Sequence, residues 1–175
     1  MKIGLLSDTH DHIDPKIFAY FKDRDELWHA GDIGSLTAAK VLEDFLPLRA
    51  VHGNIDDKTV QSRFAEDLFF PCEGFNIFMT HIGGKPPTYN PRVRKILSAR
   101  SPDIFICGHS HMLLVKRDAT LNNMLFLNPG AAGNHGFHVM KTIVRFELNK
   151  KKIESLEVIE LGKRGTIPVG DSQNL

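Results

Sequence analysis

The chain has 175 residues, and its 22 basic and 21 acidic side chains leave a formal net charge of +1. This balance argues against a broad basic face that would bind nucleic acid through its phosphates. No apolar run approaches the ~20 residues that cross a bilayer, and the N-terminal run is too short for a signal peptide. We therefore expect a cytoplasmic globular protein with no membrane partner, in one domain that covers residues 1–175.

Two residue types narrow the chemistry further. Cys72 and Cys107 lack the spacing of a disulfide framework, which indicates buried thiols in a reducing compartment. Nine histidines are many for this length, and they are unevenly distributed. They are His10, His12, His29, His52, His81, His109, His111, His135 and His138.

Six short runs rich in β-branched and aromatic residues predict strands, and each ends in a polar or glycine-containing turn. In chain order the predicted strands are 2–6, 26–30, 48–51, 76–80, 103–107 and 123–127. The turns that follow them read SDTH, GDIG, HGNIDD, HIGG, GHSH and NPGAAG.

Helical patterns lie between several of these strands, at 15–23, 35–46 and 90–100. Ser35 and Asn90 are expected to cap the second and third helices, and Pro91 suits a first helical turn. The apolar stripe of the second helix is expected to contain Leu36, Ala39, Val41, Leu42 and Leu46. Alternating strands and helices predict an α/β fold.

The pattern changes near the C-terminus. Residues 141–149 and 152–161 alternate like the two strands of an antiparallel hairpin. The tail from Gly162 onwards shows no periodicity, so we expect it to be extended or loose.

The loops after the predicted strands carry metal-competent side chains. In α/β sheets, ligands bind beyond the carboxyl ends of the strands. Because residues i and i+2 of an extended backbone point the same way, each D-x-H or H-x-H pair can face one site. Taken singly, each motif is more simply an ordinary polar turn. Together they offer about enough ligands for two ions: Asp8, His10, Asp32, Asn54, His81, His109 and His111.

The order D-x-H, G-D, G-N, H and G-H-x-H resembles that of the calcineurin-like metallophosphoesterase superfamily. The matching stretches read SDTH, AGDIG, HGNID, THIGG and CGHSH, and the short chain is similar to the small prokaryotic phosphodiesterase branch. The resemblance implies a four-layer αββα sandwich of two mixed β-sheets flanked by helices. It places the C-terminal hairpin in the second sheet.

The resemblance also implies two metal sites that share Asp32. One ion would be held by Asp8, His10, Asp32 and His111, and the other by Asp32, Asn54, His81 and His109. Imidazole, carboxylate and amide ligands together favour transition metals over Mg²⁺ or Ca²⁺. Manganese is the first expectation, and Ni, Fe, Zn and Co are the alternatives.

In this family a hydroxide that bridges the two ions would attack a small phosphate ester in line. Asn54, Asp32 and His81 are the residues to which the resemblance assigns catalytic roles, and a homodimer is implied as well. One departure concerns Ile55, because many relatives have a histidine there that is thought to protonate the leaving group. Three other histidines are weak candidates for this proton donor: His12, His135 and His138. For all three, a polar position on the surface is the simpler interpretation.

Residues around the ligands have expected supporting roles. Asp56 is the first choice for orienting the ligand loops, while His29 and His52 are more simply core histidines. Residues 83–91 are expected to influence substrate choice.

Two alternatives to a phosphoesterase remain open. The same fold serves as a protein-interaction scaffold with vestigial or no catalysis in eukaryotic retromer, although all seven ligand types are intact here. Some relatives cleave DNA, but the nearly neutral charge makes nucleic acid the weaker expectation.

Overall fold

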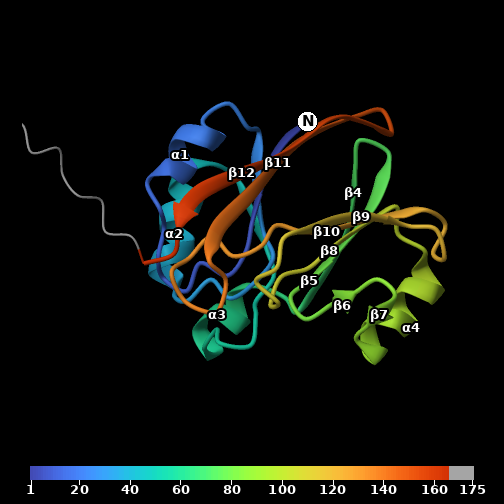
Figure 1. The fold of residues 1–175 in the computed structure, drawn as a ribbon, viewed down its shortest axis with the longest axis horizontal. Coiled ribbons are helices and arrows are strands. Elements are labelled where there is room, and N and C mark those ends of the chain that lie inside the picture. Colours follow the sequence, from blue (N-terminus) through green and yellow to red (C-terminus); the bar gives the residue numbers. More distant parts are fainter. Residues whose placement is uncertain (166–175) are drawn as a thin grey trace, which may run out of the picture.

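The structure is a computed structural model, and it describes residues 1–165. Within them, the strands form two mixed five-stranded sheets and one short two-stranded ribbon. The first sheet has the order β12-β11-β1-β2-β3, and β1, β2 and β3 are parallel. Figure 1 shows the antiparallel neighbours β12 and β11 of this sheet side by side. Its strands are β1 (Lys2–Leu6), β2 (Glu26–His29), β3 (Leu48–Ala50), β11 (Met140–Asn149) and β12 (Lys152–Lys163).

The second sheet has the order β4-β5-β8-β10-β9, with a parallel centre and an antiparallel strand at each edge. Its strands are β4 (Asp67–Cys72), β5 (Phe75–Thr80), β8 (Ile104–Ile106), β9 (Leu114–Asp118) and β10 (Met124–Asn128). The ribbon pairs β6 (Gly84–Lys85) with β7 (Thr88–Tyr89), inside the loop for which we expect a role in substrate choice.

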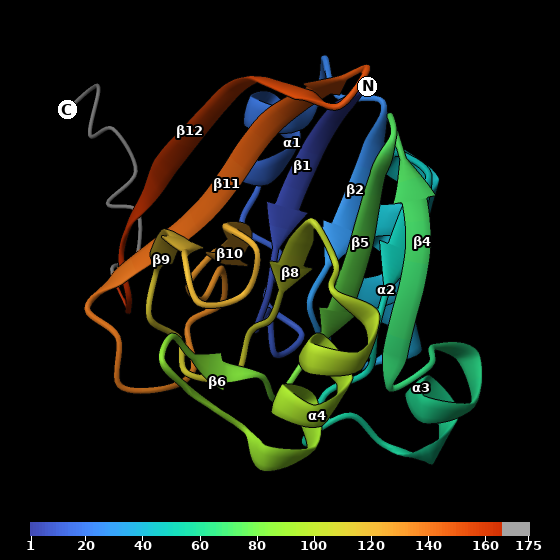
Figure 2. The ribbon, with the colours of Figure 1, turned by 90° about the vertical axis from the view of Figure 1, so that its right-hand side faces the viewer.

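Helices cover the outer faces of both sheets. Residues of α1 (Lys16–Phe21) and α2 (Leu36–Phe45) pack on the first sheet, and those of α4 (Pro91–Arg100) pack on the second. Figure 2 shows α4 in front of the second sheet. The layers are therefore helix, sheet, sheet and helix, which confirms the predicted αββα architecture. The short helix α3 (Lys58–Arg63) packs against α2.

The main core lies between the two sheets. Trp28 and Phe146 from the first sheet are fully buried there and meet apolar residues of β5, β8 and β10. Parallel strands that are covered on both faces need apolar residues at consecutive positions, which is why these strands are continuous apolar runs in the sequence. None of the helices in residues 1–165 is long and apolar enough to cross a membrane.

Local signals in the sequence correctly marked two helix starts. The Ser35 side chain accepts a hydrogen bond from the Ala38 amide (3.2 Å), and the Asn90 side chain accepts one from Arg92 N (2.9 Å). The apolar stripe of α2 is narrower than expected, because Leu36 and Val41 are exposed while Ala39 and Leu42 are buried.

All six predicted strands are present, but several elements were not anticipated. These are β4, β6, β7, β9 and α3, which are short or lie at sheet edges. The hairpin of β11 and β12 was placed in the wrong sheet: β11 pairs antiparallel with β1 and extends the first sheet. Gly162 and Lys163 still belong to β12, and the rest of the predicted tail beyond residue 165 lies outside the described residues.

Both cysteines are buried free thiols, as predicted. Cys107 follows β8 directly, and burial raises the pKa of its thiol to about 12. Such a thiol is unreactive near neutral pH.

Gly4 in β1 determines how closely α1 approaches the first sheet. A Cβ at this position would lie 2.7 Å from Cδ2 of the Phe21 ring. Replacement of Gly4 by alanine should therefore displace Phe21 and lower the free energy of unfolding by about 1–3 kcal/mol, measured by urea denaturation.

The double variant Gly4→Ala/Phe21→Ala is the test of this mechanism, since alanine at position 21 removes all three ring atoms that a Cβ at position 4 would meet. Adding Gly4→Ala to Phe21→Ala should therefore cost less stability than adding it to the wild type. Strictly additive losses would contradict the proposed contact.

Candidate metal centre

The seven predicted ligands lie at the carboxyl ends of strands from both sheets. Asp8 and His10 follow β1, Asp32 follows β2, and Asn54 follows β3. His81 follows β5 in the second sheet, and His109 and His111 follow β8. Because the parallel strands of both sheets end at the same edge of the sandwich, these loops converge.

Six of the seven side chains form two groups that share Asp32. The first group is Asp8, His10, Asp32 and His111, and its ligand atoms lie within 4.8 Å of one another. The second is Asp32, His81 and His109, by the same measure. Asn54 lines the same hollow as Asp32, next to both groups.

Each oxygen of the Asp32 carboxylate faces a different one of the two ligand groups. Its Oδ2 lies 3.7 Å from His10 Nε2, and its Oδ1 lies 3.2 Å from His81 Nε2. In the first group, His111 Nε2 lies 3.1 Å from Asp8 Oδ1. This arrangement suits a carboxylate shared by two cations.

Several buried polar atoms at the centre have no hydrogen-bond partner. They are Asp8 Oδ1, His10 Nε2 and His81 Nε2. An unpaired buried polar atom is costly, and most such atoms in proteins are satisfied by protein, water or an ion. Three of them on side chains that also converge are therefore the pattern expected of ligand atoms that face a cation.

The protonation of His81 supports the same conclusion. Its Nδ1 lies 2.8 Å from the Ala30 carbonyl oxygen and donates to it, so the Nε2 lone pair of the neutral ring points to the carboxylates. Burial lowers the pKa of His81, but Asp32 and Asp8 outweigh burial and the pKa is raised. A positive charge is thus favoured between these groups, and a divalent cation can supply it in place of the proton.

Burial also lowers the pKa of two other candidate ligands, His10 and His109. It is the largest influence on each ring, and it brings both pKa values below the usual 6.5. Both imidazoles are therefore neutral at pH 7 and offer lone pairs, the form that binds metals.

The backbone of the ligand loops was predicted wrongly. Asp8, His10, Asp32, His109 and His111 all have positive φ, between 47° and 67°, and are not extended. Left-handed backbone costs a non-glycine residue about 1–2 kcal/mol, so it persists only where surrounding contacts impose it. Hydrogen bonds from Asp8 N to Gly31 O (3.0 Å) and from His10 N to Asp32 O (3.1 Å) impose it here.

Asp56 links the loops that carry two of the ligands. Its carboxylate accepts hydrogen bonds from Ile33 N (3.2 Å), Gly34 N (2.8 Å) and Gly53 N (2.7 Å). Gly53 is needed at this junction, because a Cβ there would lie 2.0 Å from Asp32 Oδ1. The structure therefore supports the predicted orienting role of Asp56.

His29 is a satisfied core histidine, as expected. Its Nδ1 accepts from Gly31 N (3.2 Å), so Nε2 carries the proton and donates to Thr9 Oγ1 (2.9 Å). Complete burial lowers its pKa to about 4, which keeps the ring neutral. His52 is half-buried, and its Nδ1 contacts the carbonyl of Gly53 at 3.2 Å.

The centre opens into a cleft of about 480 Å³. Residues 135–138, between β10 and β11, form one side of this cleft. The His135 ring lies 5.0 Å from the His10 ring, and the His138 ring lies 5.2 Å from the His111 ring. His135 is exposed, as the simpler interpretation predicts, and His138 is half-buried, yet both line the cleft. Two histidines three residues apart after the sixth predicted strand are the sequence signal that points to this part of the site.

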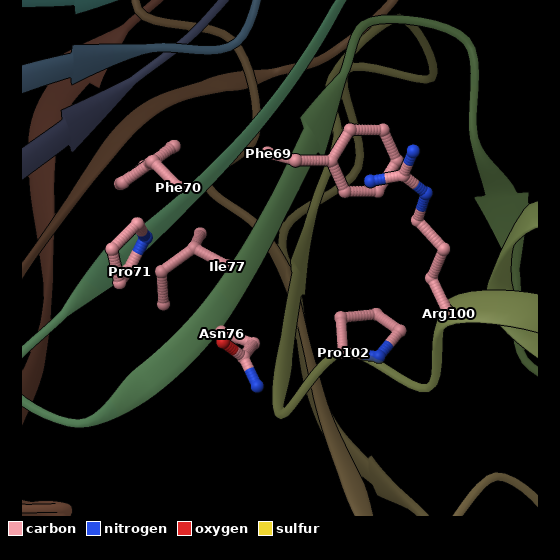
Figure 3. Close-up of a pocket in the computed structure, with 7 residues that line it drawn as sticks. All are labelled: Phe69, Phe70, Pro71, Asn76, Ile77, Arg100 and Pro102. Atoms are coloured by element: carbon pink, nitrogen blue, oxygen red, sulfur yellow. The ribbon is translucent and has the colours of Figure 1, made fainter.

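A separate groove lies away from this centre, across β4 and β5 near the end of α4 (Figure 3). Its volume is about 420 Å³, and the Arg100 guanidinium stands 4.2 Å from the centre of the Phe69 ring. None of the seven predicted ligands lines it.

Comparison with known proteins agrees with the fold. The family model described as the calcineurin-like phosphoesterase superfamily domain matches residues 1–151. The protein therefore belongs to the calcineurin-like phosphoesterase superfamily.

Relatives share much of the chain. A probable metallophosphoesterase of Methanothermobacter thermautotrophicus is 31% identical over 140 residues, which is 75% of this chain and 77% of that protein. A phosphodiesterase of Methanocaldococcus jannaschii is 29% identical over 146 residues, 74% of this chain and 83% of that one. The crystal structure of Vps29 complexed with zinc from Entamoeba histolytica has the same fold, with a TM-score of 0.70 at 18% identity, covering 92% of this chain and 98% of that one.

Replacing Asp56 by asparagine tests the orienting role. An amide group cannot accept all three backbone hydrogen bonds, so the loops of Asp32 and Asn54 should shift. We expect metal affinity, measured by calorimetric titration with Mn²⁺, to fall by about 10- to 100-fold.

The matched control is Asp57→Asn, because Asp57 is the exposed neighbour that caps α3 through Thr59 N and Val60 N. It should leave metal affinity near the wild-type value. Equal losses in both variants would contradict a specific role for Asp56.

The lowered pKa of His29 predicts acid sensitivity. The unfolded chain binds a proton at this ring below pH 6.5, whereas the folded protein resists protonation until about pH 4. The stabilisation is therefore complete above pH 6.5 and is lost as the pH falls towards 4, by up to about 3 kcal/mol.

The measurement is the free energy of unfolding in urea, with a chelator present, for the wild type and His29→Gln. The wild type should lose more stability over this pH range, because the other histidines titrate in both proteins. Parallel curves would mean that His29 is not the group responsible.

Proposed function

We propose that the protein is a dinuclear metal-dependent phosphodiesterase that hydrolyses a small phosphate ester. The observation that carries this proposal is the sharing of Asp32 between two groups of convergent ligand atoms, three of which are buried without a partner. Membership of the phosphoesterase family and a relative named as a phosphodiesterase support it.

The metal assignment follows the two groups. Asp8, His10, Asp32 and His111 would hold one ion, and Asp32, Asn54, His81 and His109 would hold the other. Bound divalent ions would supply Lewis acidity, which stabilises charge on the phosphoryl oxygens and lowers the pKa of an attacking water. Manganese is our first choice, and the nitrogen-rich donor set is equally compatible with Ni, Fe, Zn or Co.

Backbone groups of the protein hold two of these ligands in position. Asp32 is held through Ile55 N, which donates to its Oδ1 at 3.1 Å, and His81 is held through Ala30. Asn54 is exposed, and it lines both the main cleft and a smaller hollow of about 210 Å³. We assign Asn54 the orientation of the phosphoryl group between these two spaces.

The charge of the cleft favours diesters over monoesters. Among the residues that the structure describes, no lysine or arginine lines the cleft or the smaller hollow. A monoester dianion brings one more negative charge than a diester, and here only the metal ions would balance it. A diester also has two organic groups, which matches the two spaces beside Asn54.

The protein-interaction scaffold is the second candidate function. It is favoured by the fold of the Vps29 neighbours, one of which was solved in complex with a cyclic peptide. The intact ligand set and the buried unpartnered atoms favour a metal centre, and membership of the phosphoesterase family favours an enzyme at that centre.

The decisive experiment is the hydrolysis of bis-p-nitrophenyl phosphate by Mn²⁺-loaded protein. His81→Ala and Asp32→Asn each remove a proposed ligand, and Asp32 serves both sites. We expect kcat/KM to fall by more than the roughly 10- to 100-fold loss typical of a residue that only orients a ligand.

Asp44→Asn is the control for Asp32→Asn, because Asp44 is exposed on α2 and pairs with Lys40. It should retain wild-type activity. Wild-type activity in both ligand variants would refute the two-metal site, and a protein that neither binds metal nor hydrolyses the ester would support the scaffold.

A further inference from the structure

We propose that this site selects phosphodiesters carrying a flat apolar group, such as an aromatic ring. The group would bind to an apolar rim that we define as Ile55, Met112 and Phe137. The inference rests on the proposed function, since the phosphoryl group would be held by the adjacent metal centre.

The apolar rim surrounds the same cleft as the candidate ligands. Ile55 follows β3, Met112 follows β8, and Phe137 stands between β10 and β11, and all three line the cleft. Three loops distant in the sequence thus each place one large apolar side chain beside the metal centre.

Folding does not account for this placement. The exposed fractions are 44% for Ile55, 60% for Met112 and 102% for Phe137. Apolar side chains stabilise a fold only through the area they remove from water, so Phe137 contributes almost nothing in this way. A single exposed apolar residue is ordinary, but a group of them around a polar cleft is typical of a ligand-binding site.

The other side of Asn54 carries fewer large apolar side chains. The smaller hollow there is lined by one, Ile82, together with polar residues such as His52, Gln61 and Thr80. A diester held at the metal centre would therefore meet three large apolar side chains on one side and one on the other. This difference assigns the apolar arm of the substrate to the rim.

The chemistry of the rim also limits the choice of ligand. Phe137 offers an aromatic face and Met112 a flexible thioether, and both form favourable contacts with aromatic rings. None of the three side chains can donate a proton or pair with a charge. A sugar or a second phosphate would lose hydrogen bonds to water at the rim and gain none.

Calorimetry with two phosphodiesters of equal charge tests the proposal. Diphenyl phosphate and dimethyl phosphate differ only in their organic groups, so the ratio of their Kd values measures apolar selection at the Mn²⁺-loaded site. We expect diphenyl phosphate to bind about 10-fold more tightly or better, with a negative heat-capacity change.

The double variant Met112→Ser/Phe137→Ser should reduce this ratio by about 3- to 10-fold and leave the Kd of dimethyl phosphate unchanged. Both side chains are exposed, so the fold should tolerate the change. The control is Val158→Ser, since Val158 is an exposed apolar residue on β12 that does not line the cleft.

Each outcome is decisive. An unchanged ratio in the double variant, or equal Kd values in the wild type, would overturn the proposal. So would a double variant that changes only the oligomeric state, which would make the rim a contact between copies of the chain. The proposed function is judged separately, by hydrolysis: selective binding without hydrolysis would reject the enzyme and retain the rim.

Discussion

A buried carboxylate, that of Asp32, is the constraint on which the rest of the centre depends. It leaves β2 in the first sheet, yet its Oδ1 lies 3.2 Å from His81 of the second sheet. A buried negative charge is unfavourable unless positive or donor groups surround it. The loops of both sheets must therefore meet at this point, and only the face-to-face stacking of the sheets allows them to do so.

The convergence has a cost in backbone strain, and the structure shows what offsets it. Five of the seven predicted ligands have left-handed backbone, which local propensity disfavours. The loops are held in this conformation by backbone hydrogen bonds between them and by the three amide groups that Asp56 binds. Ligand direction is thus determined by a network that spans the loops, and each loop alone would relax.

Fold and site carry different information about function. The fold is shared with Vps29 at 18% identity, so it distinguishes poorly between an enzyme and a scaffold. The arrangement of donor atoms favours phosphoester chemistry, but it says little about the organic part of a substrate. That information lies at the margin of the cleft, where Ile55, Met112 and Phe137 form the apolar rim.

The sequence by itself determined what depends on near neighbours. Apolar runs located six strands, Ser35 and Asn90 marked helix starts, and the strand-end position of polar residues predicted the seven candidate ligands. Only the tertiary structure decided which distant residues meet. His109 N donates to Asp8 Oδ2 (3.2 Å) across 101 positions, β11 pairs with β1, and His135 reaches His10. Such contacts follow from sheet pairing and stacking, which local periodicity does not encode because it records only how a segment buries its own apolar face.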